Sequence, residues 1–423
     1  MNGTTTPGRT RMVALTIGTL ATVWLPACNG ARLVESGLEP PPTVTVYPGD
    51  NIQHKVDSAP GDTRFLIKAG IHLGQSVLPK SGNTFIGEPG AILDGENAVR
   101  YAFDGVTHGP PFPSNVTIRG LLIRRYNGPL QSAAILAGHM WDPAAVTIGW
   151  IVEDNELTEN AAGGIRIGSH TLVLRNTVHH NGQIGISGVG DSTLVADNEI
   201  AYNNTANVDP GWEAGGAKFV LTHDLVVRGN FVHHNNGIGL WSDISSYHTL
   251  YENNRIEDNA FAGIFVELTY GAIIRKNAVY RNGFSQPEPA WVLGAGIMLA
   301  NSSDVEIYDN TVVDNRQGIT GYHQRRGVTP YEQSLPQPYG PWNTRNNFIH
   351  DNDITMRVGM TGMAQDVDLG ADMFALWNNR FANNRYLLPT SNALPFAWSN
   401  TPMTAAQWVS AGQDASGTFA VAR

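Results

Sequence analysis

Residues 237–267 read GIGLWSDISSYHTLYENNRIEDNAFAGIFVE and contain two similar runs, GLWSD and GIFVE. Aligned on their first glycines, these runs match Trp241 with Phe265 and Asp243 with Glu267. Alternate side chains of a strand share a face, so Trp241 and Asp243 point the same way. If the two runs are neighbouring strands, an aromatic ring lies over an aromatic ring and a carboxylate over a carboxylate.

A repeat through the rest of the chain indicates that these strands do stack. The pattern Asn-x-x-x-x-Asn recurs nine times, and the first asparagines of successive pairs are 21 to 37 residues apart. The pairs are Asn155/Asn160, Asn176/Asn181, Asn198/Asn203, Asn230/Asn235, Asn254/Asn259, Asn277/Asn282, Asn310/Asn315, Asn347/Asn352 and Asn379/Asn384. Short apolar runs lie between them, and a Gly-Ile-x-apolar run often follows the second asparagine. The repeating unit is about 22 residues, lengthened by insertions.

This repeat predicts an all-β fold, a single right-handed parallel β-helix over residues 43–385. Each unit forms one coil of about three short strands, and apolar residues at alternate positions fill the interior. Asparagine tolerates a left-handed backbone in turns, and its amide can bond the same amide one coil further on. The constant five-residue spacing disfavours a β-sandwich. Residues 386–423 are predicted to cap the open end, with a short helix near Trp408.

Composition argues against nucleic acid as a partner. The chain has 423 residues, 46 of them glycine, with 15% charged residues and a formal net charge of −10. No basic stripe is present in the sequence. This balance suits a turn-rich, β-rich extracellular protein.

The N-terminus indicates export. Residues 1–28 have a positive start, an apolar stretch too short for a comfortable membrane span, and then Leu-Pro-Ala-Cys, which resembles a bacterial lipobox. Cys28 is the only cysteine, so it has no disulfide partner, and the resemblance implies that its thiol is lipidated. Ordinary secretion remains the alternative. Residues 29–42 are predicted to be a tether, and we expect a secreted protein, lipid-anchored at the bacterial cell surface or in the periplasm.

Three insertions lie beside one strand position of the repeat. They cover residues 204–215, 283–294 and 321–342, and they carry aromatic and charged side chains. Candidate substrate-binding residues among them are Trp212, Glu213, Trp291 and His323. Insertions in a solenoid become loops on one face, which is often the binding face, although random loop growth would look the same.

Aligning the Gly-Ile-x-apolar strands predicts two outward columns of side chains. The column at the level of Trp241 contains Arg166, Gly185, Lys218, Trp241, Phe265 and Met298. The column at the level of Asp243 contains Gly168, Ser187, Val220, Asp243, Glu267 and Ala300. Polar and aromatic side chains therefore gather on three consecutive coils.

The carboxylates of Asp243 and Glu267 are the predicted catalytic pair. Neighbouring strands lie about 4.8 Å apart, so the two carboxyl groups should be roughly 5 Å apart, as in a retaining glycosidase. Anions this close raise one pKa, which leaves one acid and one nucleophile. Trp241 and Phe265 would form a platform for a sugar ring. A calcium site or a solvated row of charges remains an alternative.

Cationic and acidic neighbours complete the predicted carbohydrate site. Lys218, Glu213 and Arg166 could bond sugar hydroxyls or a substrate carboxylate. We expect a polysaccharide or oligosaccharide as partner. We expect no cofactor and no dedicated metal ligands, with calcium kept only for the alternatives.

These features resemble a known superfamily. Residues 49–53, 67–72 and 87–95, with the repeat, resemble bacterial right-handed β-helix proteins of the pectate-lyase-like superfamily. The W-x-D strand followed one coil later by F-x-E is similar to the active-site strands of β-helical retaining glycoside hydrolases, notably the β-helical β-xylosidase family. That resemblance implies Asp243 as nucleophile and Glu267 as acid/base. It covers about 30 residues, so the sugar does not transfer.

Two other functions stay open at this point. Calcium-dependent alginate and chondroitin lyases use a Glu-x-x-x-x-Lys segment, and Glu213 to Lys218 has that spacing, with Lys218 as the base. Those lyases place an arginine one coil later, where Trp241 stands here. The aspartate motifs of polygalacturonases and the D-P-H motif of alginate epimerases are absent from the sequence. A non-catalytic glycan-binding surface protein is the third hypothesis.

Overall fold

A computed structural model describes residues 42–139, 142–285, 291–367, 369–389 and 394–421. The predicted signal peptide, Cys28 and the tether as far as residue 41 lie outside these residues. No described helix is long and apolar enough to cross a membrane.

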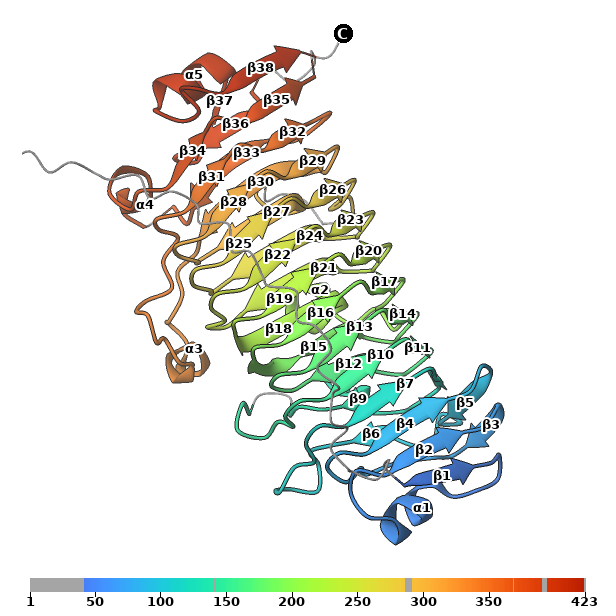
Figure 1. The fold of residues 1–423 in the computed structure, drawn as a ribbon. Helices are drawn as coiled ribbons and strands as arrows, with labels where there is room; N and C mark the ends of the chain where they lie inside the picture. The colour runs from blue at the N-terminus through green and yellow to red at the C-terminus, as the bar shows by residue number, and fades with distance from the viewer. Residues whose placement is uncertain (1–41, 140–141, 286–290, 368, 390–393, 422–423) are drawn as a thin grey trace, which may run out of the picture. The chain divides into compact units, whose positions relative to one another are not determined.

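The described chain winds through three sheets in turn, so that one strand of each sheet makes up most coils (Figure 1). The first sheet has 13 strands: β1 (Thr43–Val46), β2 (Arg64–Ile67), β4 (Thr84–Gly87), β7 (Thr117–Arg119), β10 (Ile151–Glu153), β13 (Leu172–Leu174), β16 (Leu194–Ala196), β19 (Val226–Arg228), β22 (Leu250–Glu252), β25 (Ile273–Arg275), β28 (Glu306–Tyr308), β31 (Phe348–His350) and β34 (Arg380–Ala382). The second has 13: β3 (Gly70–Leu73), β5 (Ala91–Asp94), β8 (Leu122–Arg124), β11 (Glu156–Thr158), β14 (Thr177–His179), β17 (Glu199–Ala201), β20 (Phe231–His233), β23 (Arg255–Glu257), β26 (Ala278–Tyr280), β29 (Thr311–Val313), β32 (Asp353–Thr355), β35 (Arg385–Leu388) and β38 (Thr418–Val421). The third has 12: β6 (Phe103–Asp104), β9 (Ala133–Leu136), β12 (Gly163–Ile167), β15 (Ile184–Asp191), β18 (Gly215–His223), β21 (Ile238–Asp243), β24 (Ala262–Glu267), β27 (Ala295–Ala300), β30 (Gln317–His323), β33 (Thr361–Gln365), β36 (Phe396–Trp398) and β37 (Thr401–Met403).

The predicted parallel β-helix is thereby confirmed, because successive strands of each sheet pair in parallel and in register. The antiparallel pair β36–β37 ends the third sheet. Each strand sends one residue or more inward, and inward residues of one sheet stack on their equivalents in the next coil. In the third sheet these fully buried residues are Ile135, Ile165, Ile186, Ala217, Leu240, Ile264, Ile297 and Ile319. Burial of such continuous apolar stacks stabilises the coil stacking.

Two buried asparagine ladders follow the turns. One runs from the first asparagine of each predicted pair, and the other from the second. Asn176 shows the pattern: its Nδ2 donates to Val152 O at 2.9 Å and to Asn198 Oδ1 at 3.0 Å, while its Oδ1 accepts from the backbone N–H of Asn155 at 3.1 Å. Each amide therefore satisfies backbone groups that the turn would leave unpaired.

The structure differs from the prediction in two details of these ladders. In the last two coils Asn352 and Asn384, the second members of their pairs, continue the first ladder, because Asn310 Nδ2 bonds Asn352 Oδ1. Asn347 and Asn379 instead bond each other in the turn that precedes the first-sheet strands β31 and β34. The ladder asparagines are also not left-handed themselves. The residue before each one has that backbone, as at Arg175 with φ 52°.

Asn176→Ala is expected to destabilise the protein substantially. The substitution leaves the buried carbonyl of Val152 and the N–H of Asn155 without their amide partner, at about 1–3 kcal/mol for each buried group. Chemical denaturation would measure the loss against the wild type. Asn127→Ala at an exposed position should change stability by no more than about 0.5 kcal/mol. Equal losses in both variants would contradict a structural role for the ladder.

Short helices lie at both ends of the stack and in the insertions. They are α1 (Ile52–Ser58), α2 (Pro210–Glu213), α3 (Pro330–Ser334), α4 (Asp372–Ala375) and α5 (Ala405–Ser410). Helix α1 lies in a stretch expected to be coil strands, and it buries Ile52 and Val56. Helix α5 is the predicted C-terminal helix and buries Trp408. Strands β35, β36, β37 and β38 extend the sheets beyond residue 385, and Asp414 takes the last rung by accepting from Asn384 Nδ2 at 2.9 Å.

Candidate functional site

The outer face of the third sheet brings the predicted aromatic pair together. Trp241 on β21 pairs in register with Phe265 on β24, and their rings stack with centroids 5.3 Å apart and planes 26° from parallel. Ser242 and Val266 pair at the next position, so Asp243 and Glu267 occupy equivalent places one residue further along. The two carboxylates line the same cleft.

The predicted outward columns are wrong for one coil, the one that contains β15. Ser187 pairs with both Arg166 and Lys218, so it belongs to the Trp241 level, where Gly185 was expected. Gly185 lies two residues earlier. The inward isoleucines set this register, because Ile186 stacks between Ile165 and Ala217 in the core.

Lys218 and Asp243 form a nearly buried ion pair on the outer face of the third sheet. Lys218 Nζ lies 2.8 Å from Asp243 Oδ2, donates to Trp212 O at 2.6 Å, and sits 3.4 Å from the centre of the Trp241 ring. Asp243 Oδ1 accepts from the N–H of Ile244 at 2.7 Å. Both side chains are nearly buried, at 5% and 7% exposure. Shielding from water strengthens the attraction between the two side chains.

The carboxyl group of Glu267 is in a different electrostatic environment from that of Asp243. Burial raises the pKa of its carboxyl to about 8, and the neighbouring charge of Asp243 adds to the rise, while Arg326 and Lys218 oppose it. The Nη2 of Arg326 bonds Glu267 directly and also donates to Gln324 Oε1 at 2.8 Å. The two adjacent carboxyl groups therefore have different surroundings: Asp243 contacts the ammonium of Lys218, whereas Glu267 is buried and bonds Arg326.

The three predicted insertions all reach this face. Residues 209–212 of the first insertion, Leu293 of the second, and several residues between Tyr322 and Leu335 of the third contribute to two adjacent clefts. A polar cleft of about 400 Å³ contains Asp243 and Lys218. An apolar cleft of about 410 Å³ contains Phe265 and Met298. Both volumes fall in the usual range for small-ligand sites.

The two clefts share one wall. It is formed by Gly211, Trp241, Glu267 and Arg326, which line both. The Nε of Arg326 is buried there without a hydrogen-bond partner among the described residues.

Arg166 and Glu213 do not line either cleft, although both were expected to bind substrate. They form a buried ion pair at 3.1 Å, with side chains 1% and 3% exposed. Gln131 Nε2 donates to Glu213 Oε2 at 2.8 Å, and Gln183 Nε2 donates to the Glu213 carbonyl at 2.7 Å. These bonds fasten α2 to the sheet. They thereby hold the carbonyl of Trp212 where it accepts a hydrogen bond from Lys218 Nζ.

The other predicted binding residues lie in different surroundings. Trp212 is 42% exposed and lines the polar cleft. Trp291 is half-buried and is not among the residues of either cleft. His323 is buried at the end of β30, edge-on to Trp377 at 4.9 Å, and burial lowers the pKa of its imidazole. It also lines neither cleft.

Sequence reasoning missed the most important loop residue, Arg326. The sequence placed an Arg-Arg pair in the third insertion, but nothing in it showed which arginine would meet Glu267, 59 residues away. Tyr331 and Glu332 line the polar cleft from the same insertion, and Glu332 lies 3.4 Å from Arg326. Burial raises the pKa of the Tyr331 phenol, and Asp243 and Glu213 add to that rise.

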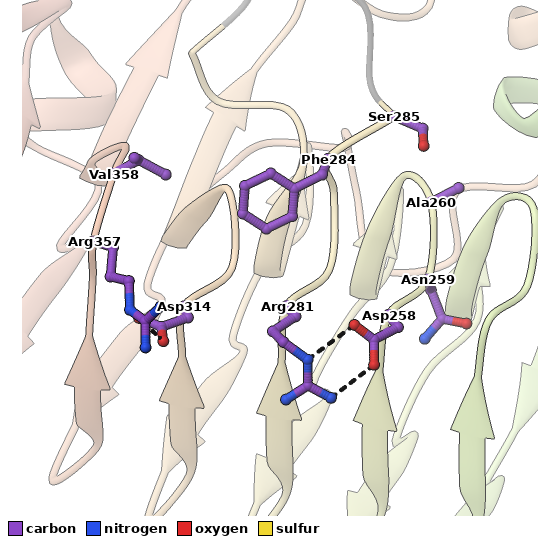
Figure 2. Close-up of a pocket in the computed structure, with 9 residues that line it drawn as sticks. All are labelled: Asp258, Asn259, Ala260, Arg281, Phe284, Ser285, Asp314, Arg357 and Val358. Carbon is purple, nitrogen blue, oxygen red and sulfur yellow. Dashed lines mark hydrogen bonds and ion pairs between the residues drawn. The ribbon is translucent and has the colours of Figure 1, made fainter.

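A separate hollow lies on the turns between the second and third sheets (Figure 2). Its charged residues bond each other: Arg281 pairs with Asp258 at 2.7 Å and Arg357 with Asp314 at 2.9 Å. Phe284 and Val358 flank these pairs and are exposed. This hollow contains neither Asp243 nor Glu267.

No group of three or more His, Cys, Asp or Glu side chains in the described part of the chain is arranged to hold a metal ion. The ammonium of Lys218 is also fully engaged by a carboxylate, a carbonyl and an aromatic face. A lyase base has to accept a proton, so Lys218 would have to leave these contacts to act as one.

Comparison with known proteins agrees with the fold. A family model described as "Right handed beta helix region" matches residues 139–288. The A-module of the mannuronan C-5 epimerase AlgE6 from Azotobacter vinelandii is similar in structure, with a TM-score of 0.57 and 15% identity over 88% of this chain and 94% of that one. XylC in complex with xylose is similar with a TM-score of 0.56 and 13% identity, over 80% of each chain. No curated protein sequence gives a significant match.

The fold and its comparisons define a right-handed parallel β-helix protein. At identities of 13–15% these likenesses establish the fold alone.

Proposed function

We propose that this protein is an exported, carbohydrate-active enzyme that cleaves glycosidic bonds by a retaining mechanism, with Asp243 as nucleophile and Glu267 as acid/base. The observation that supports it best is the contrast within one cleft: Asp243 pairs with the ammonium of Lys218 at 2.8 Å, while burial raises the pKa of Glu267 to about 8. A retaining glycosidase needs one carboxylate and one carboxylic acid.

The expected separation of the carboxyl groups fits the same mechanism. Neighbouring strands lie about 4.8 Å apart, which suits the roughly 5 Å of a retaining pair rather than the wider inverting gap. Glu267 donates its proton to the glycosidic oxygen as Asp243 attacks the anomeric carbon and the aglycone leaves. The Glu267 carboxylate then takes a proton from water, whose oxygen displaces Asp243 from the sugar.

Similar structures support carbohydrate as the substrate class. XylC was solved with xylose, and AlgE6 is a mannuronan C-5 epimerase. Epimerase or lyase chemistry remains the alternative for this chain, but Lys218 would have to leave its contacts with Asp243 and Trp212 to act as the base.

A product assay tests the proposal. The protein from residue 29 onward is incubated with neutral and acidic glycans and with 4-nitrophenyl glycosides, with and without chelator. We expect new reducing ends or nitrophenol, no absorbance from new double bonds, and a product that keeps its anomeric configuration. Absorbance from unsaturated sugars would instead favour a lyase, and binding without any product would favour a non-catalytic glycan-binding protein.

Arg326→Gln is expected to shift the alkaline limb of activity to higher pH. Arg326 favours the charged form of Glu267, so its removal raises the pKa of that carboxyl further above 8, and the acid keeps its proton longer. The pH dependence of kcat/KM measures the shift. Arg325→Gln removes the same charge from a residue outside both clefts and should move the limb much less. A shift to lower pH in Arg326→Gln would contradict the assignment.

A further inference from the structure

The apolar cleft beside Asp243 and Glu267 has no role in the two steps of the proposed cleavage. Its apolar lining comes from β21, β24, β27 and two of the insertions. The apolar residues include Trp241, Phe265, Leu293 and Met298. Most of them form one packed cluster on the outer face of the sheet, separate from the core inside the coils. An apolar cleft of this size that opens to solvent indicates a binding site.

The position of Glu267 indicates which part of the substrate the apolar cleft would contact. A nucleophile must contact the glycone, and Asp243 lines only the polar cleft. The acid must contact the glycosidic oxygen, which lies between glycone and aglycone, and Glu267 lies in the wall that both clefts share. A substrate bound with its sugar in the polar cleft therefore directs its leaving group into the apolar one.

A second sugar would be poorly matched to the apolar cleft. Most polar side chains in its lining are engaged by other protein groups. Tyr322 donates to Asp366 at 2.5 Å, Asp209 accepts from the N–H of Gly211 at 2.9 Å, and Arg326 bonds both Glu267 and Gln324. Sugar hydroxyls buried there would lose water without gaining equivalent bonds, which is unfavourable.

We propose that the apolar cleft binds the aglycone of the substrate, and that this aglycone is a hydrophobic aryl or alkyl group. The inference rests on the proposed glycosidase function and narrows its substrate from glycans in general to glycosides with an apolar leaving group. Trp241 and Phe265 then contact the aglycone with their stacked rings, and Met298, an adaptable side chain, closes the far side.

The first test measures binding and does not need turnover. 4-Methylumbelliferone, an aryl alcohol without sugar, is titrated into the wild-type protein by calorimetry at pH 6, and we expect a Kd of about 1 mM or tighter. Met298→Glu places a charge in the cleft and should weaken binding about tenfold or more. Met298→Gln, a milder change of similar length, should weaken it in the same direction.

Val358→Glu is the matched control, because it adds the same charge to the exposed hollow of Figure 2. Binding should be unchanged in this variant, and thermal melts would show that all variants are folded. Absence of binding at millimolar concentration, or binding that Val358→Glu weakens and Met298→Gln does not, would overturn the proposal.

Turnover provides a separate second test. Once the product assay has identified the glycone, its cyclohexylmethyl and methyl glycosides are compared, since both leaving groups are simple alcohols. We expect kcat/KM to favour the cyclohexylmethyl glycoside about tenfold or more, and Met298→Gln to reduce that preference. Equal kcat/KM values would reject the hydrophobic aglycone and leave the glycosidase intact. Aryl binding without turnover of any glycoside would instead reject the glycosidase.

Discussion

Asp243→Asn is expected to lower glycosidic cleavage by about a thousandfold or more, the larger of the two effects that the site predicts. An amide oxygen is a poor nucleophile and cannot form the glycosyl ester on which the retaining pathway depends. The substitution keeps the shape of the side chain and its place beside Trp241 on the outer face of β21. Initial rates on the best substrate of the product assay would measure the loss.

Stability has to be separated from chemistry in this variant. Removing one partner of a nearly buried ion pair leaves Lys218 uncompensated, which typically destabilises by about 3–5 kcal/mol. The double variant Lys218→Met/Asp243→Asn removes both charges and should regain much of that stability while staying inactive. Recovery of activity together with stability would show that Asp243 has only a structural role.

A chemical rescue gives an independent reading of the nucleophile. Asp243→Gly opens space beside the anomeric carbon, where azide can attack a substrate with a good leaving group. The expected product is a glycosyl azide of inverted configuration, because one displacement replaces two. Failure of azide to restore any turnover in a folded variant would argue against Asp243 as the nucleophile.

The repeating part of the structure was accessible from sequence because it depends on local periodicity. Inward residues such as Ile264 alternate with outward ones, and a ladder asparagine ends the turn of each regular coil, so one coil predicts the next. The stacking of Trp241 on Phe265 follows from this register alone. The pattern failed at Asn347 and Asn352. The five-residue spacing is the same there, but Asn352 occupies the position of the first ladder and Asn347 lies one turn earlier in the coil.

The rest of the site depends on contacts between distant residues. A buried ion pair and a substrate-binding pair use the same residue types, so Arg166 and Glu213 could not be assigned before their burial was known. Arg326 reaches Glu267 from a long insertion whose path has no periodicity. The protonation of Glu267 likewise depends on burial by loops, which a single strand pattern does not encode.

Glu267→Gln is expected to lower activity about 10²- to 10⁴-fold on substrates with poor leaving groups, because glutamine cannot donate the proton that the departing oxygen needs. The loss should be much smaller for 2,4-dinitrophenyl glycosides, whose leaving group departs without protonation. In the wild type, activity should fall as pH rises through about 8, where Glu267 loses its proton. This alkaline limb should be absent from the variant. An unchanged limb would assign the acid to another group.

The same carboxyl should also make folding stability depend on pH, which can be measured without a substrate. Its pKa is raised from 4.5 to about 8 in the folded protein, so its favourable contribution is complete below pH 4.5 and is lost as pH rises toward 8. The wild type should therefore lose stability relative to Glu267→Gln across that window, because the glutamine has no proton to lose. Parallel plots of melting temperature against pH would mean that Glu267 is already ionised at neutral pH. In that case Glu267 could not act as the general acid.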